Sequence, residues 1–129
     1  MTMSVFHSLL NRTFQIARRR RTSDGRGGWP IDYVLIGSVE GRMRPATSSE
    51  REAGKREERE ITHVLYVVAG TDIRRGDLIS PGVLNITSDG VTASDVLVEV
   101  MARREPSHAG EHYEYDCLER QRESQDDGS

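Results

Sequence analysis

Hydrophobic and polar residues alternate over short stretches along most of the chain, a period of two that is typical of β-strands. Phe14 and Ile16 share one face of the first stretch, residues 13–17. Residues 61–69 are apolar on both faces and rich in β-branched side chains, which predicts a central strand. The same reasoning predicts further strands over residues 77–80, 83–87, 96–102 and 112–118.

A longer extended run covers residues 29–43 and contains Gly37 and Gly41. Glycine inside a strand marks a bulge or a close approach of two backbones, as at the bend of a small barrel. Turns rich in Gly, Pro, Ser and Asp separate the predicted strands. We therefore predict a mostly β fold, a small barrel or sandwich of about five to seven antiparallel strands. A short helix over residues 4–10 is the one helical candidate outside the charged segment described next.

Residues 46–60 differ from the rest, because nine of these fifteen residues are charged and none has a large apolar side chain. Their Glu, Arg and Lys content suits a solvated helix. A stretch of this length without apolar residues is more often a functional or disordered loop. We expect a mobile charged loop over 45–60, with these candidate functional residues: Ser48, Ser49, Glu50, Arg51, Glu52, Lys55, Arg56, Glu57 and Glu58.

The composition limits the class of protein. The chain has 129 residues, 35% hydrophobic, 5% aromatic and 30% charged, which predicts one domain over 1–129. One cysteine cannot form an internal disulfide, and no apolar run approaches the ~18 residues of a membrane helix, so we expect no membrane partner. Residues 1–44 hold eight Arg and three acids, whereas 61–129 hold six basic and thirteen acidic residues. Opposite charge in the two parts favours contacts between copies.

Candidate chemistry is sparse. The sequence has no nucleophile elbow, phosphate-binding loop or paired metal-ligand motif, so we predict no catalytic residue, no metal site, no cofactor and no enzyme activity. His108 and His112 have helical spacing, but Pro106 and Gly110 favour a solvated loop there. Cys117 alternates with tyrosines and is expected to be a buried, inert thiol. The basic run Arg18, Arg19, Arg20 and Arg21 is a candidate contact with another subunit or with DNA phosphates.

Five segments, taken in order, resemble the head-tail joining proteins of tailed bacteriophages, the head-closure or stopper subunits of the neck. They are an opening strand preceded by Arg12, a glycine-rich turn before Trp29, a strand ending at Pro45, a Thr-His strand at His63, and Arg75-Gly-Asp-Leu-Ile with the terminal Tyr-Asp-Cys-Leu-Glu. Together they cover residues 10–16, 24–29, 39–45, 61–67, 75–79 and 115–119. Residues 80–95 depart from the family pattern and look like an inserted hairpin, and residues 120–129 are expected to be a disordered tail.

The resemblance implies a β-barrel that forms a six- or twelvefold homo-oligomeric ring in the virion neck, assembled in the host cytoplasm. Such a ring lies below the portal or adaptor protein and above the tail terminator or tail tube protein, and it retains packaged double-stranded DNA. In stopper members a loop in the position of residues 45–60 reaches into the channel. Two alternatives stay open: another small neck or tail component such as a tail terminator, and an OB-like barrel that binds single-stranded nucleic acid.

Overall fold

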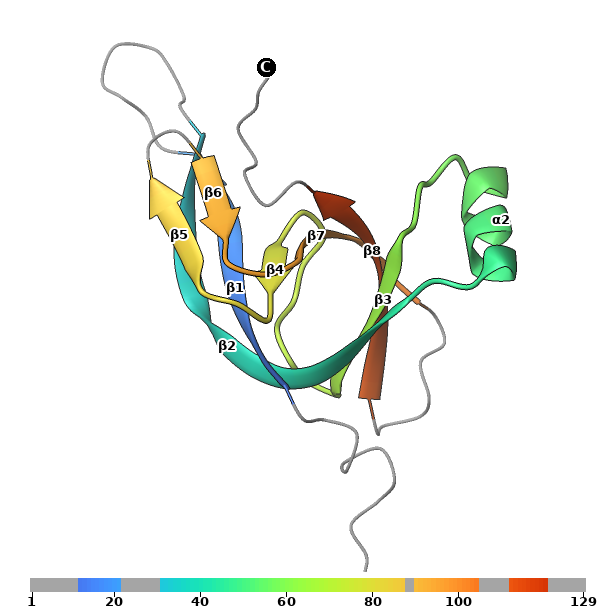
Figure 1. Cartoon of the computed structure of the whole chain (residues 1–129), viewed down its shortest axis with the longest axis horizontal. Helices are drawn as coiled ribbons and strands as arrows, with labels where there is room; N and C mark the ends of the chain where they lie inside the picture. The colour runs from blue at the N-terminus through green and yellow to red at the C-terminus, as the bar shows by residue number, and fades with distance from the viewer. Residues whose placement is uncertain (1–11, 22–30, 88–89, 105–111, 121–129) are drawn as a thin grey trace, which may run out of the picture.

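The computed structural model describes residues 12–21, 31–87, 90–104 and 112–120. They form eight strands and one helix (Figure 1). The elements are β1 (Arg12–Arg21), β2 (Ile31–Pro45), α2 (Ser48–Arg56), β3 (His63–Val68), β4 (Leu78–Ser80), β5 (Leu84–Thr87), β6 (Gly90–Ala93), β7 (Leu97–Arg103) and β8 (His112–Arg120). The helix expected at 4–10 and most of the expected tail at 120–129 lie outside the described residues.

Six antiparallel strands close into a barrel in the order β1-β2-β3-β8-β7-β4, which confirms the predicted small β-barrel. The remaining strands, β5 and β6, pair with each other as a hairpin within residues 80–95. β1 extends beyond the strand expected at residues 13–17, because the four arginines 18–21 continue the strand and pair with β2. The basic run is therefore part of the barrel wall.

The two glycines of β2 have the roles that their positions predicted. Ile16 pairs with Gly37 and Ala17 pairs with Leu35, so one residue of β2 is left over as a bulge, and Gly37 has a φ of +145°. At Gly41 an added Cβ would lie 2.5 Å from the carbonyl oxygen of Tyr66 on β3. β2 can bend and approach β3 closely because both positions lack a side chain.

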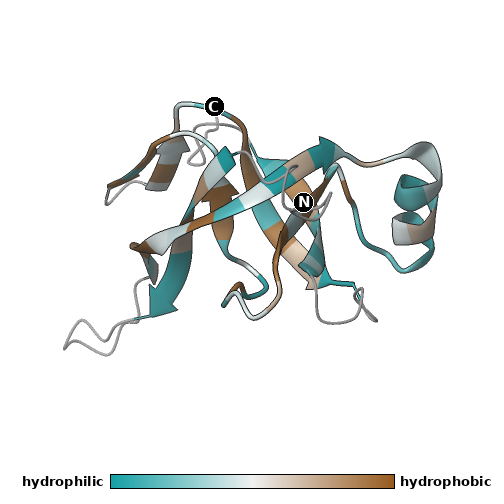
Figure 2. Cartoon of the chain, turned by 90° about the horizontal axis from the view of Figure 1, so that it is seen from below, coloured by the Kyte–Doolittle hydropathy of each residue, from teal (hydrophilic) through white to brown (hydrophobic). Residues whose placement is uncertain are grey.

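The barrel interior is filled by apolar side chains from every barrel strand, and Figure 2 shows hydrophobic residues concentrated on the strands while α2 is mostly hydrophilic. Phe14, Leu65, Ile79 and Val98 are completely buried there. A second buried cluster joins the barrel to the hairpin; its members are Ala17, Leu78 and Leu97 of the barrel and Leu84 and Val91 of the hairpin. The hairpin thus packs on the barrel through its own apolar face.

The close approach at Gly41 gives a direct test of the barrel wall. Gly41→Ala places a methyl group against the Tyr66 carbonyl and the Val67 side chain, and overpacking of this kind costs about 1–3 kcal/mol. Urea unfolding should show this loss, whereas Ser38→Ala, at an exposed position of the same strand, should leave the free energy of unfolding almost unchanged. Equal stability of the two variants would show that β2 and β3 are not this close.

Candidate functional site

The charged segment between β2 and β3 contains a helix, so the expectation of a loop is wrong for residues 48–56. A capping box starts the helix: the backbone N–H of Glu50 donates to Thr47 Oγ1 at 3.2 Å, and the Thr47 N–H donates to Glu50 Oε1 at 2.8 Å. Glu50 lies in the first turn and Lys55 and Arg56 in the last, which suits the helix dipole. Local chemistry thus forms a helix that has no apolar stripe.

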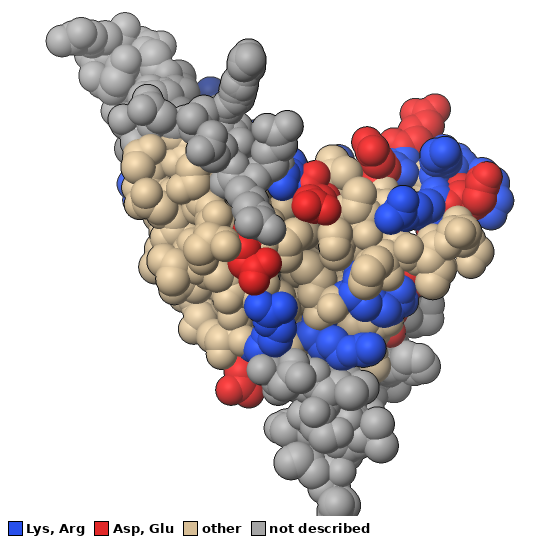
Figure 3. Space-filling view, viewed as in Figure 1, with Lys and Arg blue, Asp and Glu red and all other residues tan. Residues whose placement is uncertain are grey.

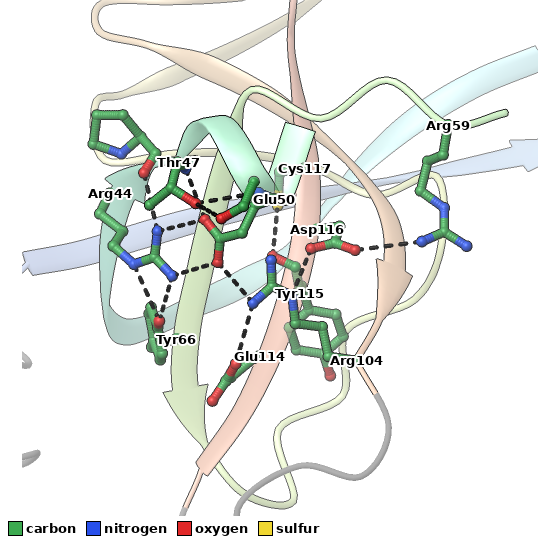
Figure 4. Close-up of polar contacts among 12 residues, drawn as sticks. Arg44, Thr47, Glu50, Arg59, Tyr66, Arg104, Glu114, Tyr115, Asp116 and Cys117 are labelled. Carbon is green, nitrogen blue, oxygen red and sulfur yellow. Dashed lines mark hydrogen bonds and ion pairs between the residues drawn. The ribbon is translucent and has the colours of Figure 1, made fainter. Parts of the chain in front are cut away.

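Glu50 also fixes α2 to the barrel (Figure 4). Its carboxylate accepts two hydrogen bonds from Arg44 of β2, at 2.8 and 2.7 Å, and lies 2.9 Å from Nη1 of Arg104, which follows β7. Arg44 in turn donates from Nε and Nη2 to the hydroxyl of Tyr66 on β3, at 3.1 and 2.9 Å. The hydrogen bond from Arg44, with those from Thr47 and Arg104, holds the pKa of Glu50 well below its usual range.

The same network continues across β8 to the segment that follows α2. Arg104 Nε donates to Asp116 Oδ1 at 2.7 Å, and Asp116 is only 6% exposed. The other oxygen of Asp116 lies 3.4 Å from Arg59, which also pairs with Glu57 at 3.2 Å. A chain of alternating charges therefore joins both ends of the helical segment to β8.

A small apolar cluster next to these ion pairs also attaches the helical segment to the barrel. Ala46, Ile61 and Val64 form a small buried cluster, separate from the barrel interior. Gly54 is the buried residue of α2, and a Cβ added there would lie 2.7 Å from the Ile61 side chain and 2.8 Å from the carbonyl oxygen of Arg59. The helix can lie this close to Arg59 and Ile61 only because residue 54 has no side chain.

A polar groove of about 600 Å³ lies between α2 and the ends of β7 and β8. Its lining includes Glu50, Arg59, Arg104, Glu114 and Asp116. These charges neutralise one another through the ion pairs described above, and Arg104 also lies 3.6 Å from Glu114. The groove therefore presents both signs of charge, with one more acid than arginine among these residues.

The predicted site residues divide into one anchor and an exposed surface. Glu50 faces the barrel, whereas the other eight predicted residues are exposed on α2 and the turn after it. These are Ser48, Ser49, Arg51, Glu52, Lys55, Arg56, Glu57 and Glu58, with three basic and three acidic side chains. We call this set the helix surface; Figure 3 shows blue and red side chains gathered over α2.

The predicted basic site divides in the same way. Arg18 is largely buried and binds the carboxylate of Asp77 through Nε and Nη2, at 3.0 and 2.9 Å, while Asp77 is 1% exposed. Hydrogen bonding to Asp77 raises the pKa of Arg18. Arg19, Arg20 and Arg21 are exposed on the outside of β1. Arg18 is therefore a structural residue, and the candidate contact surface reduces to the three arginines after it.

The remaining candidate side chains in the described residues, one cysteine and two histidines, belong to barrel strands β3 and β8. Cys117 is completely buried in the barrel, and burial raises the pKa of its thiol. Burial lowers the pKa of the His63 imidazole. His112 begins β8, where the predicted strand over 112–118 also begins, and its Nε2 lies 3.0 Å from Glu114. His108 lies outside the described residues.

Sequence reasoning missed Arg44, Asp77, Arg104 and Asp116, the barrel residues that bind the charged segment and the basic run. Apart from the Arg44–Glu50 pair, their partners lie far away in the sequence, and the barrel topology brings them together. The capping box Thr47-Ser-Ser-Glu50, in contrast, is visible in the sequence. It was the available signal that residues 48–56 form a helix.

No family model and no curated protein matches the sequence. Within residues 12–21, 31–87, 90–104 and 112–120, no helix is long and apolar enough to cross a membrane. No group of three or more His, Cys, Asp or Glu residues in the same ranges is arranged to hold a metal ion.

The anchoring role of Glu50 predicts a pH-dependent contribution to stability. Glu50→Gln keeps a capping oxygen but removes the charge, and it should lower the free energy of unfolding at pH 7 by about 1–2 kcal/mol. Because the folded-state pKa is depressed, the stabilisation is complete above the unfolded-state value of about 4.3 and is lost as pH falls below it. Urea unfolding at pH 7 and pH 3 should show the difference from wild type shrinking with acid.

Glu52→Gln is the matched control, because Glu52 is an exposed glutamate of the same helix. It should change stability by less than about 0.5 kcal/mol at both pH values. If both glutamine variants behave alike, α2 is not held by Glu50.

The structural role of Arg18 is tested against its neighbour. Arg18→Gln leaves the buried Asp77 without its charged partner and should cost about 2–3 kcal/mol in urea unfolding. Arg20→Gln changes an exposed residue of the same strand and should cost less than about 0.5 kcal/mol. Similar effects from both substitutions would contradict the division of the basic run.

Proposed function

We propose that this protein is a structural subunit of a bacteriophage neck, a head-closure or stopper protein that forms a homo-oligomeric ring. In this role the ring binds below the portal or adaptor protein, retains packaged DNA and offers a docking surface for the tail. The observation that carries the proposal is the helix surface, a charged projection held at a fixed place on a closed barrel by Glu50.

The position of α2 supports a role in closing a channel. The helix projects from one side of the barrel between β2 and β3, where the resemblance places the channel segment of stopper proteins (Figure 1). Glu50 pairs with Arg44 of β2 and with Arg104 after β7, and Arg59 pairs with Asp116 of β8. These ion pairs fix the helix on the barrel, so each copy in a ring would present its helix surface in the same position. A fixed projection narrows a channel by occupying space.

The charge of the helix surface supports the same role. Three basic and three acidic side chains make it nearly neutral overall while every one of them stays solvated. A surface of one positive sign would bind DNA phosphates tightly and hinder ejection. A balanced surface can block a duplex without retaining it.

The side of the molecule away from α2 has the opposite character and suits contact between subunits. β5, β6 and residues 33–39 of β2 contain no charged residue, and Figure 3 shows this side mostly tan. Leu35, Ile36 and Val83 expose 53%, 40% and 67% of their surface here. Exposed apolar groups without charge are typical of protein contact surfaces.

The neck role is tested with virus particles, and the OB-like alternative with the purified protein. Electron microscopy of particles made without this protein should show filled heads that lack tails, or heads that emptied after packaging. Normal tailed particles would contradict the proposal. Binding to a single-stranded oligonucleotide at moderate salt should be weak, and tight binding would favour the OB-like alternative.

The closing role is tested separately from ring formation. Replacing residues 48–58 by a short Gly-Ser linker should leave rings visible by electron microscopy but let filled heads lose their DNA. As a control, Glu50→Gln keeps the residues of the helix surface. Heads that carry this variant should lose less DNA than heads that carry the linker variant. Heads that carry the linker variant and retain DNA like wild type would exclude the closing role.

A further inference from the structure

A cleft of about 440 Å³ on the outside of the barrel is rich in arginine and separate from the groove at α2. It is lined by Arg18, Arg19, Arg74, Arg75, Gly76, Asp77 and Glu99. These residues come from β1, the turn before β4, and β7, three neighbouring strands of the barrel. The cleft therefore runs over the outer surface of these strands near the start of β4. We call it the arginine cleft.

Part of the charge in the arginine cleft is already neutralised. Arg18 binds Asp77, and Arg74 binds Asp72 with Nε 3.2 Å from Oδ1. Glu99 is paired with Arg120. Each acid at the cleft thus has an arginine partner.

Two cations remain in excess. Arg19 and Arg75 are exposed, and neither has an ion pair within the described part of the chain. Arg20, the next residue of β1, is also exposed and adds to the positive charge beside the cleft. The arginine cleft is therefore suited to a short acidic segment that brings about two negative charges.

Such a segment directly follows β8 in the sequence. Residues 121–129 contain Glu123, Asp126 and Asp127 against one basic residue, Arg122. They follow Arg120, whose side chain binds Glu99 at the rim of the cleft and whose backbone pairs with Leu97 of β7. Glu123 is three residues from this point, so an extended chain lets it reach at most about 10 Å from Arg120, and the two aspartates can reach about 20 Å.

We propose that residues 121–129 bind the arginine cleft of their own subunit through their carboxylates. Charge complementarity carries the inference: two excess arginines face a segment with two net negative charges. Tethering at Arg120 gives the segment an effective concentration in the millimolar range, so weak ion pairs are sufficient. Exposed ion pairs are screened by salt, so the contact is strong at low ionic strength and lost at high ionic strength. This inference does not depend on the neck function.

The test places a nitroxide spin label within the segment. Cys117 is completely buried, so Ser124→Cys gives one reactive thiol for labelling. In 50 mM salt, paramagnetic broadening should weaken the amide signals of Arg19 and of residues 74–76. The signals should recover in 0.5 M salt and in the neutralised segment Glu123→Gln/Asp126→Asn/Asp127→Asn. Broadening that persists unchanged in the neutralised segment would reflect tethering alone and would overturn the proposal.

Matched arginine variants locate the contact. Arg75→Gln should remove most of the broadening at Arg19, whereas Arg51→Gln, at an exposed arginine of α2, should leave it unchanged. Equal effects of the two substitutions would mean attraction to overall positive charge and would overturn the cleft. A mixture of spin-labelled chain and ¹⁵N-labelled chain without the spin label should show no broadening. Broadening in the mixture would assign the segment to a neighbouring copy and overturn binding within one subunit.

Discussion

The carboxylate of Glu50 is the interaction on which the placement of the charged segment depends. It closes the capping box with Thr47, binds the Arg44 guanidinium through both oxygens and contacts Arg104. A helix with no apolar stripe cannot be held on a barrel by hydrophobic burial alone, because only Gly54 is buried. Partly buried hydrogen bonds to charged groups provide the attachment instead. The rest of α2 is thereby left to present charge to solvent.

The barrel could be predicted from the sequence because its signals are local. Alternating apolar residues define the strands, and the positions of Gly37 and Gly41 within a strand indicate a bulge and a close approach. The site could not be predicted in the same way. Arg104 reaches Glu50 of α2, and Asp116 reaches Arg59 after the helix, because the closed sheet places β8 next to β3 and β7 next to β8. The nine charged residues and the lack of large apolar side chains in 46–60 lead to the prediction of a loop. The capping box at Thr47 and Glu50 is the local reason for a helix there.

The basic run shows how one sequence feature can serve two purposes. Arg18 lies within hydrogen-bonding distance of a carboxylate that is almost completely buried, so it belongs to the fold. Arg19 and Arg20 lie on the outside of the same strand, where a partner can reach them. The whole molecule follows this division. Charges that meet across strands stabilise the barrel, and exposed charges gather on α2 and β1, while the surface of β5, β6 and residues 33–39 stays uncharged.

The charged segment is a positioned helix in the isolated protein. Backbone ¹⁵N relaxation of the amides of Glu50–Arg56, compared with those of β3 and β8, tests it most directly. A helix held by Glu50 should give order parameters near 0.85, equal to those of the barrel strands. Values below about 0.6 across the segment would show a flexible loop and contradict the account.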